Sequence, residues 1–139
     1  MIRMATINDF EGINRLGATL GYEVASEEHA RERLLKVLNA SNTNHVWVFE
    51  QDDEVKGWIH GFISLRVASD PFIEIGGIVV DDSVRRQGVG TKLVEHVRDW
   101  ANESGFGLRV RSNVERPETH AFYQALGLAE EKRQCVFLG

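Results

Sequence analysis

The chain has 139 residues, of which 42% are hydrophobic and 27% charged, so it is long enough for one domain with a substantial core and too short for two. Its net charge of −5 argues against a broad nucleic-acid surface, because binding to a polyphosphate chain needs many Lys and Arg contacts. No apolar run approaches the roughly 18 residues that span a bilayer, and the N-terminus has no signal-peptide core. We therefore expect a single cytoplasmic domain, residues 1–139, with no nucleic-acid or membrane partner.

Cysteine and histidine usage gives no sign of a metal site. Cys135 is the single cysteine, which excludes an intrachain disulfide and a paired-cysteine metal site. The histidines lie in different predicted elements, without the HxxxH or His-x-His spacing of metal ligands. His120 would share a helical face with Tyr123, and a surface position is its simpler interpretation. We predict no metal requirement.

The N-terminal part of the chain predicts a strand followed by two helices. Residues 2–5 are the strand, and Asn8 followed by Glu11 has the form of a capping box for a helix that ends at Gly21. Ser26 is then the N-cap of a second helix, which carries glutamates in its first turn.

The middle of the chain predicts an antiparallel hairpin and a central strand. Residues 46–49 and 55–67 are rich in β-branched and aromatic side chains, and the acidic turn 51–54 separates them. Residues 72–80 (FIEIGGIVV) are apolar almost throughout, which is typical of a strand that is covered on both faces.

The C-terminal part predicts alternating helices and strands. In order they are a helix that ends at Gly105, a strand over 108–113, a helix from Pro117 to Gly127, and a strand over 136–138. The mixed order of elements predicts an α+β fold with α/β/α layers. We expect a mixed, mostly antiparallel twisted sheet of six to seven strands, with four helices.

The loop between the central strand and the next helix has the composition of an anion site. Its sequence is RRQGVG, residues 85–90. A helix start leaves about four backbone N–H groups without partners and carries a partial positive charge, so a phosphate group can bind there. A P-loop is excluded because no Lys follows Gly90, and Leu93 stands where a dinucleotide fingerprint needs Gly or Ala. The remaining pattern, Arg/Gln-x-x-Gly-x-Gly/Ala, is matched by Arg85, Gly88 and Gly90.

In its context this pattern resembles the GNAT N-acetyltransferase superfamily. It follows an apolar strand that ends at Val80 and an acidic turn at Asp81 and Asp82, and an amphipathic helix comes next. Residues 121–128 (AFYQALGL) are similar to the family's Phe-Tyr segment, with Leu128 in place of the usual aromatic residue. The resemblance covers the whole chain. It implies a GNAT-like fold, acetyl-coenzyme A (acetyl-CoA) as donor and a primary amine as acceptor.

The resemblance also implies a cofactor site. The backbone of Ile78, Val79 and Val80 would pair with the pantetheine arm as an added strand, which needs a free strand edge. Backbone amides of the glycine loop would hold the pyrophosphate, and arginine side chains would add positive charge. The loop residues are Arg85, Arg86, Gln87, Gly88, Val89, Gly90 and Thr91, and Asn113 and Phe122 complete the predicted site.

Two catalytic side chains follow from the same resemblance. Tyr123 matches the family's usual proton donor to the departing thiolate, and the alternative is an aromatic residue with no chemical role. Glu74 is the only acidic residue in its strand, and family members often place a glutamate there to take the amine's proton, commonly through water. Ideal alternation puts Glu74 on the face of Gly76 and Ile78, although a position near the strand's start could leave it exposed. The backbone N–H of Val80 would stabilise the oxyanion.

Acceptor choice in this family depends mainly on the first two helices, the loop between them and the loop around 67–72. We expect Tyr22, Glu23 and Asp70 to bind the acceptor, whose class would be a small cationic amine such as a polyamine, an aminoglycoside or an amino-acid derivative. A protein N-terminus or lysine is the alternative acceptor. A non-catalytic coenzyme A-binding regulatory module is the alternative to an enzyme. A homodimer stays open, because dimers are common among proteins that resemble this one.

Overall fold

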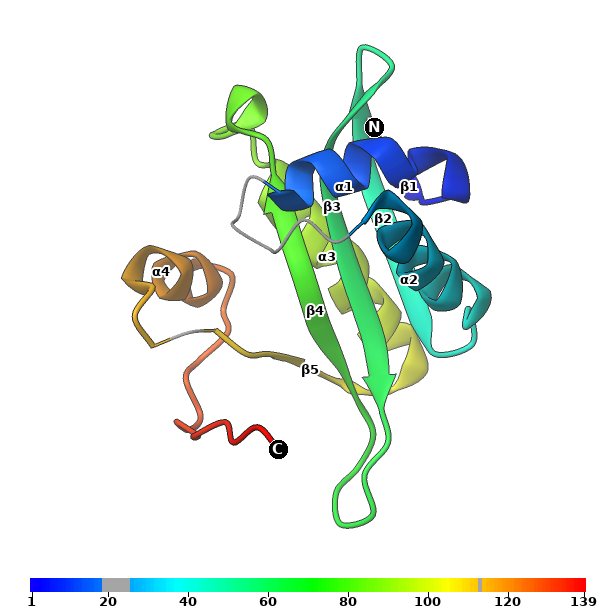
Figure 1. Ribbon diagram of the computed structural model, residues 1–139. Helices are drawn as coiled ribbons and strands as arrows, with labels where there is room; N and C mark the ends of the chain where they lie inside the picture. Colours follow the sequence, from blue (N-terminus) through cyan, green and yellow to red (C-terminus); the bar gives the residue numbers. More distant parts are fainter. Residues whose placement is uncertain (19–25, 113) are drawn as a thin grey trace.

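A computed structural model describes residues 1–18, 26–112 and 114–139 (Figure 1). Its described part contains four α helices and one sheet of five strands. The helices are α1 (Phe10–Ala18), α2 (Glu27–Asn39), α3 (Val89–Ser104) and α4 (Pro117–Ala125). The strands are β1 (Ile2–Met4), β2 (Asn44–Gln51), β3 (Glu54–Ser64), β4 (Phe72–Val80) and β5 (Gly107–Val110), and short 3-10 turns cover Ile7–Asp9 and Asp82–Val84. None of these helices is long and apolar enough to cross a membrane.

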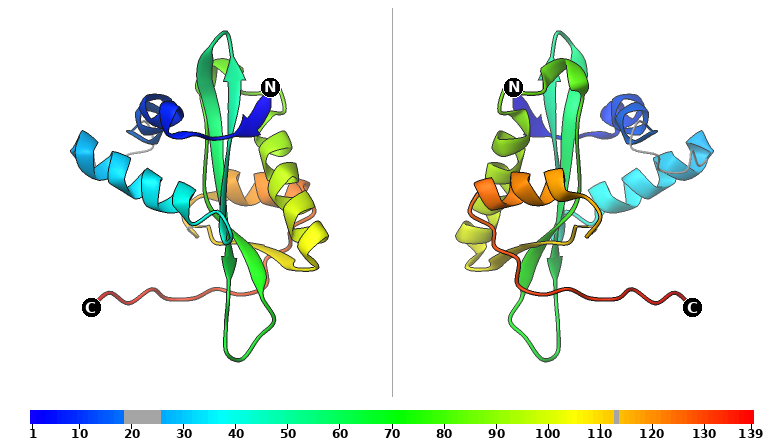
Figure 2. Two further views of the ribbon diagram at one scale, coloured as in Figure 1. Left: turned by 90° about the vertical axis from the view of Figure 1, so that its right-hand side faces the viewer. Right: turned by 90° about the vertical axis from the view of Figure 1, so that its left-hand side faces the viewer.

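The sheet has the strand order β1-β2-β3-β4-β5. Its first four strands pair antiparallel, and β5 pairs parallel to β4 after the α3 crossover. Helices α1 and α2 cover one face, α3 covers the other, and α4 lies beside β4 (Figures 1 and 2). The expected mixed, mostly antiparallel sheet between helical layers is therefore confirmed.

The expected six to seven strands are not found in the described residues. The segment predicted as a last strand, 136–138, has no regular structure, and its side chains are 80–93% exposed. A β-prone segment forms a strand only where another strand offers backbone partners, and none of the described strands pairs with this one. Figure 2 shows the C-terminal segment leaving the body on the side of the sheet that carries α1 and α2.

The start of the first helix differs from the expected capping box. Thr6, rather than Asn8, is the N-cap, and its partner is Asp9, whose carboxylate accepts from the Thr6 N–H at 2.8 Å. Arg3 on β1 donates two hydrogen bonds of 2.8 Å to the same carboxylate. The Arg3 guanidinium is the main cause of the lowered pKa of Asp9. Contact with β1 therefore favours the Thr6 cap, because the Arg3 cation stabilises the buried Asp9 carboxylate.

A bulge in β4 changes which face its side chains occupy. Pairing with β3 shifts between His60 and Gly61, so that His60 faces Gly77, Gly61 faces Ile75, and Gly76 has no partner. Ile75 and Ile78 consequently both pack toward α3, three positions apart. The prediction that Glu74 and Ile78 share a face is therefore wrong: Glu74 points to the face covered by α1 and α2.

Candidate functional site

The edge of β4 that faces β5 is only half paired. Pairing with β5 runs from Phe72 opposite Gly107 to Ile75 opposite Val110, and within the described residues it stops there. The rest of β4, residues 76–80, has no strand neighbour on that side among the residues that the structure describes. An unpaired edge presents backbone N–H and C=O groups that can accept another extended chain. The predicted pairing of β4 with a pantetheine arm needs an unpaired edge of this kind.

The first turn of α3 begins beside this edge without a side-chain cap. Gly88 is the N-cap, with φ 75° and ψ 15°, and makes no capping hydrogen bond. The first helical hydrogen bond near it runs from the Lys92 N–H to the Gly88 carbonyl. The N–H groups that precede Lys92 therefore have no intrahelical partner and meet the positive end of the helix dipole. A side chain at position 88 would meet no atom within 4 Å, so lack of space does not require glycine there. The left-handed backbone conformation does, because residues with a side chain rarely adopt it.

Two arginines stand before this turn. Arg85 makes an ion pair of 2.8 Å with Asp82, and both side chains are largely exposed. Arg86 is exposed and has φ 67°, a left-handed conformation that turns the chain into the helix. Positive charge near the first turn of α3 thus comes from Arg86 and the helix dipole, with Arg85 partly balanced by Asp82.

Helix α4 packs on the first turn of α3 through Phe122. A side chain at Gly90 would begin 3.2 Å from Phe122 Cζ and 3.7 Å from Val80 Cγ2, so glycine at 90 admits this aromatic ring. Tyr123 is 8% exposed and belongs to the main core cluster, with its ring edge-on to Phe122 at 5.2 Å between centroids. Both residues predicted on this helix therefore lie close to the loop and the unpaired edge of β4.

Glu74 lies in the part of β4 that pairs with β5, one residue before that pairing ends. Its side chain is 13% exposed, and Arg111 Nε lies 3.3 Å from its Oε1 atom. That oxygen is buried and makes no hydrogen bond within the described residues. The contact is thus an ion pair without hydrogen-bond geometry, and Oε1 keeps the capacity to accept a proton or a hydrogen bond.

His60 is a further titratable side chain on the same face of the sheet, and sequence reasoning missed it. The Nδ2 atom of Asn44 donates to Thr43 Oγ1 at 3.0 Å and to the Ala40 carbonyl at 3.4 Å, so its Oδ1 atom is the acceptor that meets His60 Nε2 at 2.8 Å. His60 Nε2 therefore carries the hydrogen, and Nδ1 carries the lone pair. Nδ1 lies 2.9 Å from the position of a side chain on Gly76.

Burial lowers the pKa of His60, so the ring is neutral at pH 7. The sequence gives a weak indication that His60 shares a strand face with two aromatic side chains, because it alternates with Trp58 and Phe62. Its partner Asn44, however, is set by the hairpin register, which the sequence does not specify.

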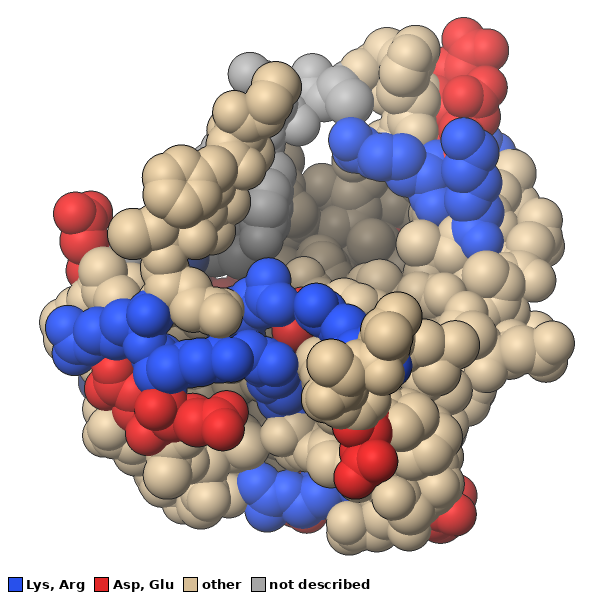
Figure 3. Space-filling model, turned by 90° about the horizontal axis from the view of Figure 1, so that it is seen from below, with Lys and Arg blue, Asp and Glu red and all other residues tan. Residues whose placement is uncertain are grey.

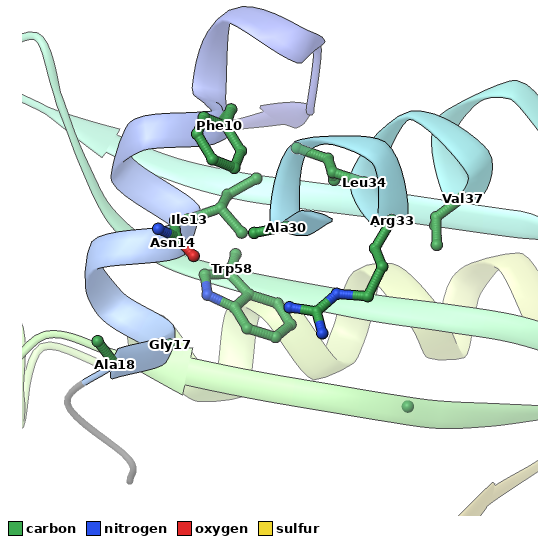
Figure 4. Close-up of a pocket in the computed structure, with 11 residues that line it drawn as sticks. Phe10, Ile13, Asn14, Gly17, Ala18, Ala30, Arg33, Leu34, Val37 and Trp58 are labelled. Carbon is green, nitrogen blue, oxygen red and sulfur yellow. The ribbon is translucent and has the colours of Figure 1, made fainter. Parts of the chain in front are cut away.

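A cavity of about 330 Å³ opens between α1, α2 and the sheet (Figure 4). Gly76 of the β4 bulge and Trp58 of β3 lie at its sheet side. Gly77 makes room for Trp58, because a side chain there would begin 3.0 Å from the indole ring. The lining consists of Phe10, Ile13, Asn14, Gly17, Ala18, Ala30, Arg33, Leu34, Val37, Trp58 and Gly76.

Of the three residues predicted to bind the acceptor, Asp70 is described by the structure, and it does not line this cavity. Asp70 is exposed in the connection between β3 and β4. Tyr22 and Glu23 lie outside the described residues, as does Asn113 of the predicted cofactor site. Within the described part of the chain, no group of three or more His, Cys, Asp or Glu side chains could hold a metal ion.

Residues 13–128 match the model of the acetyltransferase (GNAT) family. The chain therefore belongs to this family, whose members use acetyl-CoA. The uncapped first turn of α3 and the unpaired edge of β4 fit that cofactor, since one can hold its phosphates and the other its extended pantetheine arm.

One relative is similar to the chain in sequence, and two solved structures share its fold. A mycothiol acetyltransferase from Mycobacteroides abscessus is 28% identical over 102 residues, which are 73% of this chain, and the match spans only 33% of that relative's length. Glucosamine-6-phosphate N-acetyltransferase from Arabidopsis thaliana superposes with a TM-score of 0.85 at 20% identity, covering 99% of this chain and 97% of that one. The aminoglycoside N-acetyltransferase AAC(6')-Iy in complex with CoA gives a TM-score of 0.88 at 21% identity, covering 100% of this chain and 93% of that one.

Proposed function

We propose that this protein is an acetyl-CoA-dependent N-acetyltransferase that acetylates a primary amine by direct attack, with both substrates bound together. The observation that carries this proposal is the unpaired edge of β4 beside the uncapped first turn of α3. Backbone groups of Ile78, Val79 and Val80 would hold the pantetheine arm. Backbone amides from Arg86 to Thr91 would hold the pyrophosphate.

Side chains around the loop complete this cofactor site. Arg85, Arg86 and Gln87 are exposed there, Val89 is buried beneath the turn, and Phe122 covers Gly90. We expect Arg86 to attract the pyrophosphate more strongly than Arg85 does, because Asp82 already pairs with Arg85. Asn113 stays part of the predicted site.

When bound, acetyl-CoA supplies a thioester, whose C–S bond breaks as the amine nitrogen forms a C–N bond to the acetyl carbon. The Val80 N–H would stabilise negative charge that develops on the acetyl oxygen. Tyr123 would give its hydroxyl proton to the departing thiolate, since it lies on α4 beside Phe122 at the unpaired edge of β4.

Glu74 is our candidate for the base that removes the amine's proton through water. It is mostly buried, and its Oε1 atom has no hydrogen bond within the described residues. His60 is the alternative base, because its Nδ1 lone pair faces Gly76 on the same face of the sheet. Both groups could take a proton that finally leaves to solvent.

The acceptor is proposed to be a small molecule whose reacting amine is cationic in solution. A cavity of about 330 Å³ suits a small acceptor better than a protein chain. Two structural relatives are named as N-acetyltransferases of glucosamine-6-phosphate and of aminoglycosides, which supports transfer to nitrogen. Glu74 and Tyr123 favour an enzyme over a non-catalytic coenzyme A-binding module.

We also propose a homodimer. Val136, Phe137 and Leu138 are 80%, 90% and 93% exposed, and in the described sheet β5 is an edge strand that pairs with β4 alone. The C-terminal segment of a second copy could add to this edge and cover its apolar side chains. Light scattering should give a dimer that Phe137→Asp converts to a monomer. A monomeric wild type would contradict this part.

Free-thiol release from acetyl-CoA with a panel of primary amines tests the proposed activity. The panel should include spermidine, an aminoglycoside, free amino acids and a peptide with a free N-terminus. We expect thiol release to depend on both acetyl-CoA and a small amine. Binding of acetyl-CoA without thiol release from any amine would favour the non-catalytic module instead.

A further inference from the structure

Two arginines contact the ring of Phe72 at the start of β4. The guanidinium carbon of Arg109, on β5, lies 5.0 Å from the ring centroid. That of Arg66, in the connection between β3 and β4, lies 5.6 Å from the same centroid. Cation–π attraction therefore holds both guanidiniums at one partly exposed ring. We call Arg66, Phe72 and Arg109 the arginine platform.

Within the part of the chain that the structure describes, no acid pairs with either arginine of the platform. Asp70 belongs to the same connection as Arg66, but it is exposed and forms no ion pair with Arg66 or Arg109. Arg66 donates one hydrogen bond, from Nε to the Ser64 hydroxyl at 2.9 Å. A guanidinium has five N–H donors and no acceptor, so the platform keeps donors that can bind a carboxylate or a phosphate.

The platform lies on the same face of the sheet as the candidate base Glu74. Phe72 comes two residues before Glu74 in β4, and pairing with β3 is regular over this stretch, so the two side chains share a face. Arg109 stands opposite Glu74 in β5. Arg111 follows two residues later, and its contact with Glu74 shows that the arginines of β5 occupy this face. One ligand that lies along β4 can therefore meet both Glu74 and the platform.

This end of the molecule is locally positive, although the chain has a net charge of −5. Glu74 balances Arg111, whereas Arg66 and Arg109 have no acidic partner among the described residues. Seen from below, where the β3–β4 connection lies, Lys and Arg side chains gather around a hollow in the surface (Figure 3). Unbalanced positive charge at a hollow attracts an anion and disfavours a ligand with several cationic groups.

We infer that the acceptor carries an anionic group, a carboxylate or a phosphate, which binds the arginine platform while the amine reacts beside Glu74. Arg109 is its main contact, because it stands opposite Glu74 and is less exposed than Arg66. The inference rests on the proposed acetyltransferase function and narrows its acceptor class.

The spacing on β4 sets the distance between the two groups of the acceptor. Phe72 and Glu74 are two residues apart, which is about 7 Å along a strand. The amine and the anion must therefore be separated by several bonds. An α-amino acid is too short, and a polyamine or an aminoglycoside has no anionic group.

Pairs of amines that differ only in the anionic group test this inference. The pairs are ε-aminocaproate with its amide and aminopropyl phosphate with aminopropanol, and L-alanine with L-alaninamide is the short control pair. Each compound is assayed for thiol release and is titrated calorimetrically into the protein with CoA present. We expect both long anionic amines to bind at least about tenfold more tightly than their neutral partners, which is the contribution of one charge-assisted hydrogen bond. The alanine pair should differ less than about threefold.

Variants identify the side chains that cause the preference. Arg109→Gln should reduce the preference for the long anions to less than about threefold, and Arg109→Lys, which keeps the charge and loses the planar fork, should retain part of it. Arg66→Gln should weaken the preference by a smaller factor, and it decides the question if Arg109→Gln does not fold. Arg31→Gln is the matched control, because Arg31 lies 5.7 Å from the ring of Phe10 outside the platform, and it should keep the full preference.

Equal binding of the anionic and neutral amines would overturn the inference, as would an unchanged preference in Arg109→Gln and Arg66→Gln. A preference in only one of the two long pairs supports it and identifies the anion. Acetylation of an acidic peptide without any preference among the small amines would overturn it in favour of a protein acceptor. If no amine is acetylated, the proposed function fails, and the calorimetric comparison still decides whether the platform binds an anion.

Discussion

His60 on β3 and Asn44 on β2 are joined by a hydrogen bond of 2.8 Å, in which the imidazole Nε2 donates to the amide oxygen. The hydrogen bond fixes the tautomer, and Gly76 leaves space on the other side of the ring. A neutral, oriented histidine therefore lies where β4 bulges and where the cavity between α1, α2 and the sheet meets β4. The register of the β2–β3 hairpin places His60 beside Asn44. The glycine loop takes no part in this contact.

The lowered pKa of His60 makes folding stability depend on pH. The folded protein keeps the ring neutral below the ordinary pKa near 6.5, whereas the unfolded chain binds a proton there. Unfolding free energy should therefore fall as pH decreases from about 7 to 5. The fall should be shallower in His60→Gln, measured by urea unfolding. Burial also lowers the pKa of His45, which accounts for a remaining slope. Identical slopes in both proteins would contradict the buried neutral ring.

Removing the proposed base tests the role of Glu74. Glu74→Gln keeps the shape of the side chain and should lower kcat about 100-fold, because general-base catalysis typically contributes that much. The KM for acetyl-CoA should stay constant. Arg111→Gln is the control, since it removes the ion-pair partner and keeps the carboxylate. A kcat unchanged in Glu74→Gln and reduced in His60→Gln would transfer the role to His60.

The hydroxyl of Tyr123 is tested by deleting one atom. Tyr123→Phe keeps the ring that packs in the core, so its melting temperature should stay near that of the wild type. Turnover should fall about 100-fold while calorimetric affinity for acetyl-CoA is retained. Full turnover would leave Tyr123 a packing residue only.

Much of this fold could be predicted from periodicity and terminators. Ser26 caps α2 and accepts from the His29 N–H, Gly105 ends α3 with φ 72°, and β4 spans the predicted 72–80. These features depend on local sequence, which is why the chain alone reveals them.

The features that the sequence did not predict depend on contacts between residues far apart in the chain. The bulge at Gly76 arises from pairing with β3, and the Thr6 cap depends on Arg3 reaching Asp9 from β1. The cavity, with Arg33 and Trp58 facing each other, needs the packing of α2 on the sheet, which no residue pattern encodes. The glycine loop could be predicted as a cofactor site because its chemistry is local, whereas the cavity is assembled from separate elements.

The Arg3–Asp9 pair should stabilise the fold. Asp9 is 6% exposed, so Arg3→Gln would leave a buried carboxylate with one fewer cationic partner. Because Arg3 itself is partly exposed, we expect a loss of about 2 kcal/mol in urea unfolding, below the range for fully buried pairs. Arg133→Gln breaks the fully exposed pair with Glu130 and should have no measurable effect. Equal effects of the two substitutions would contradict this assignment.

Calorimetric titration of acetyl-CoA into two glycine variants tests the proposed cofactor site most directly. Gly88 and Gly105 lie at opposite ends of α3 with φ 75° and 72°, so Asp imposes similar backbone strain at both. Gly88→Asp puts a carboxylate where the pyrophosphate should bind, and Gly105→Asp does not. We predict that Gly88→Asp lowers affinity at least about 100-fold and Gly105→Asp less than about threefold, since a carboxylate at the first turn of α3 repels the pyrophosphate and opposes the positive end of the helix dipole. Wild-type affinity in a folded Gly88→Asp protein would contradict the account.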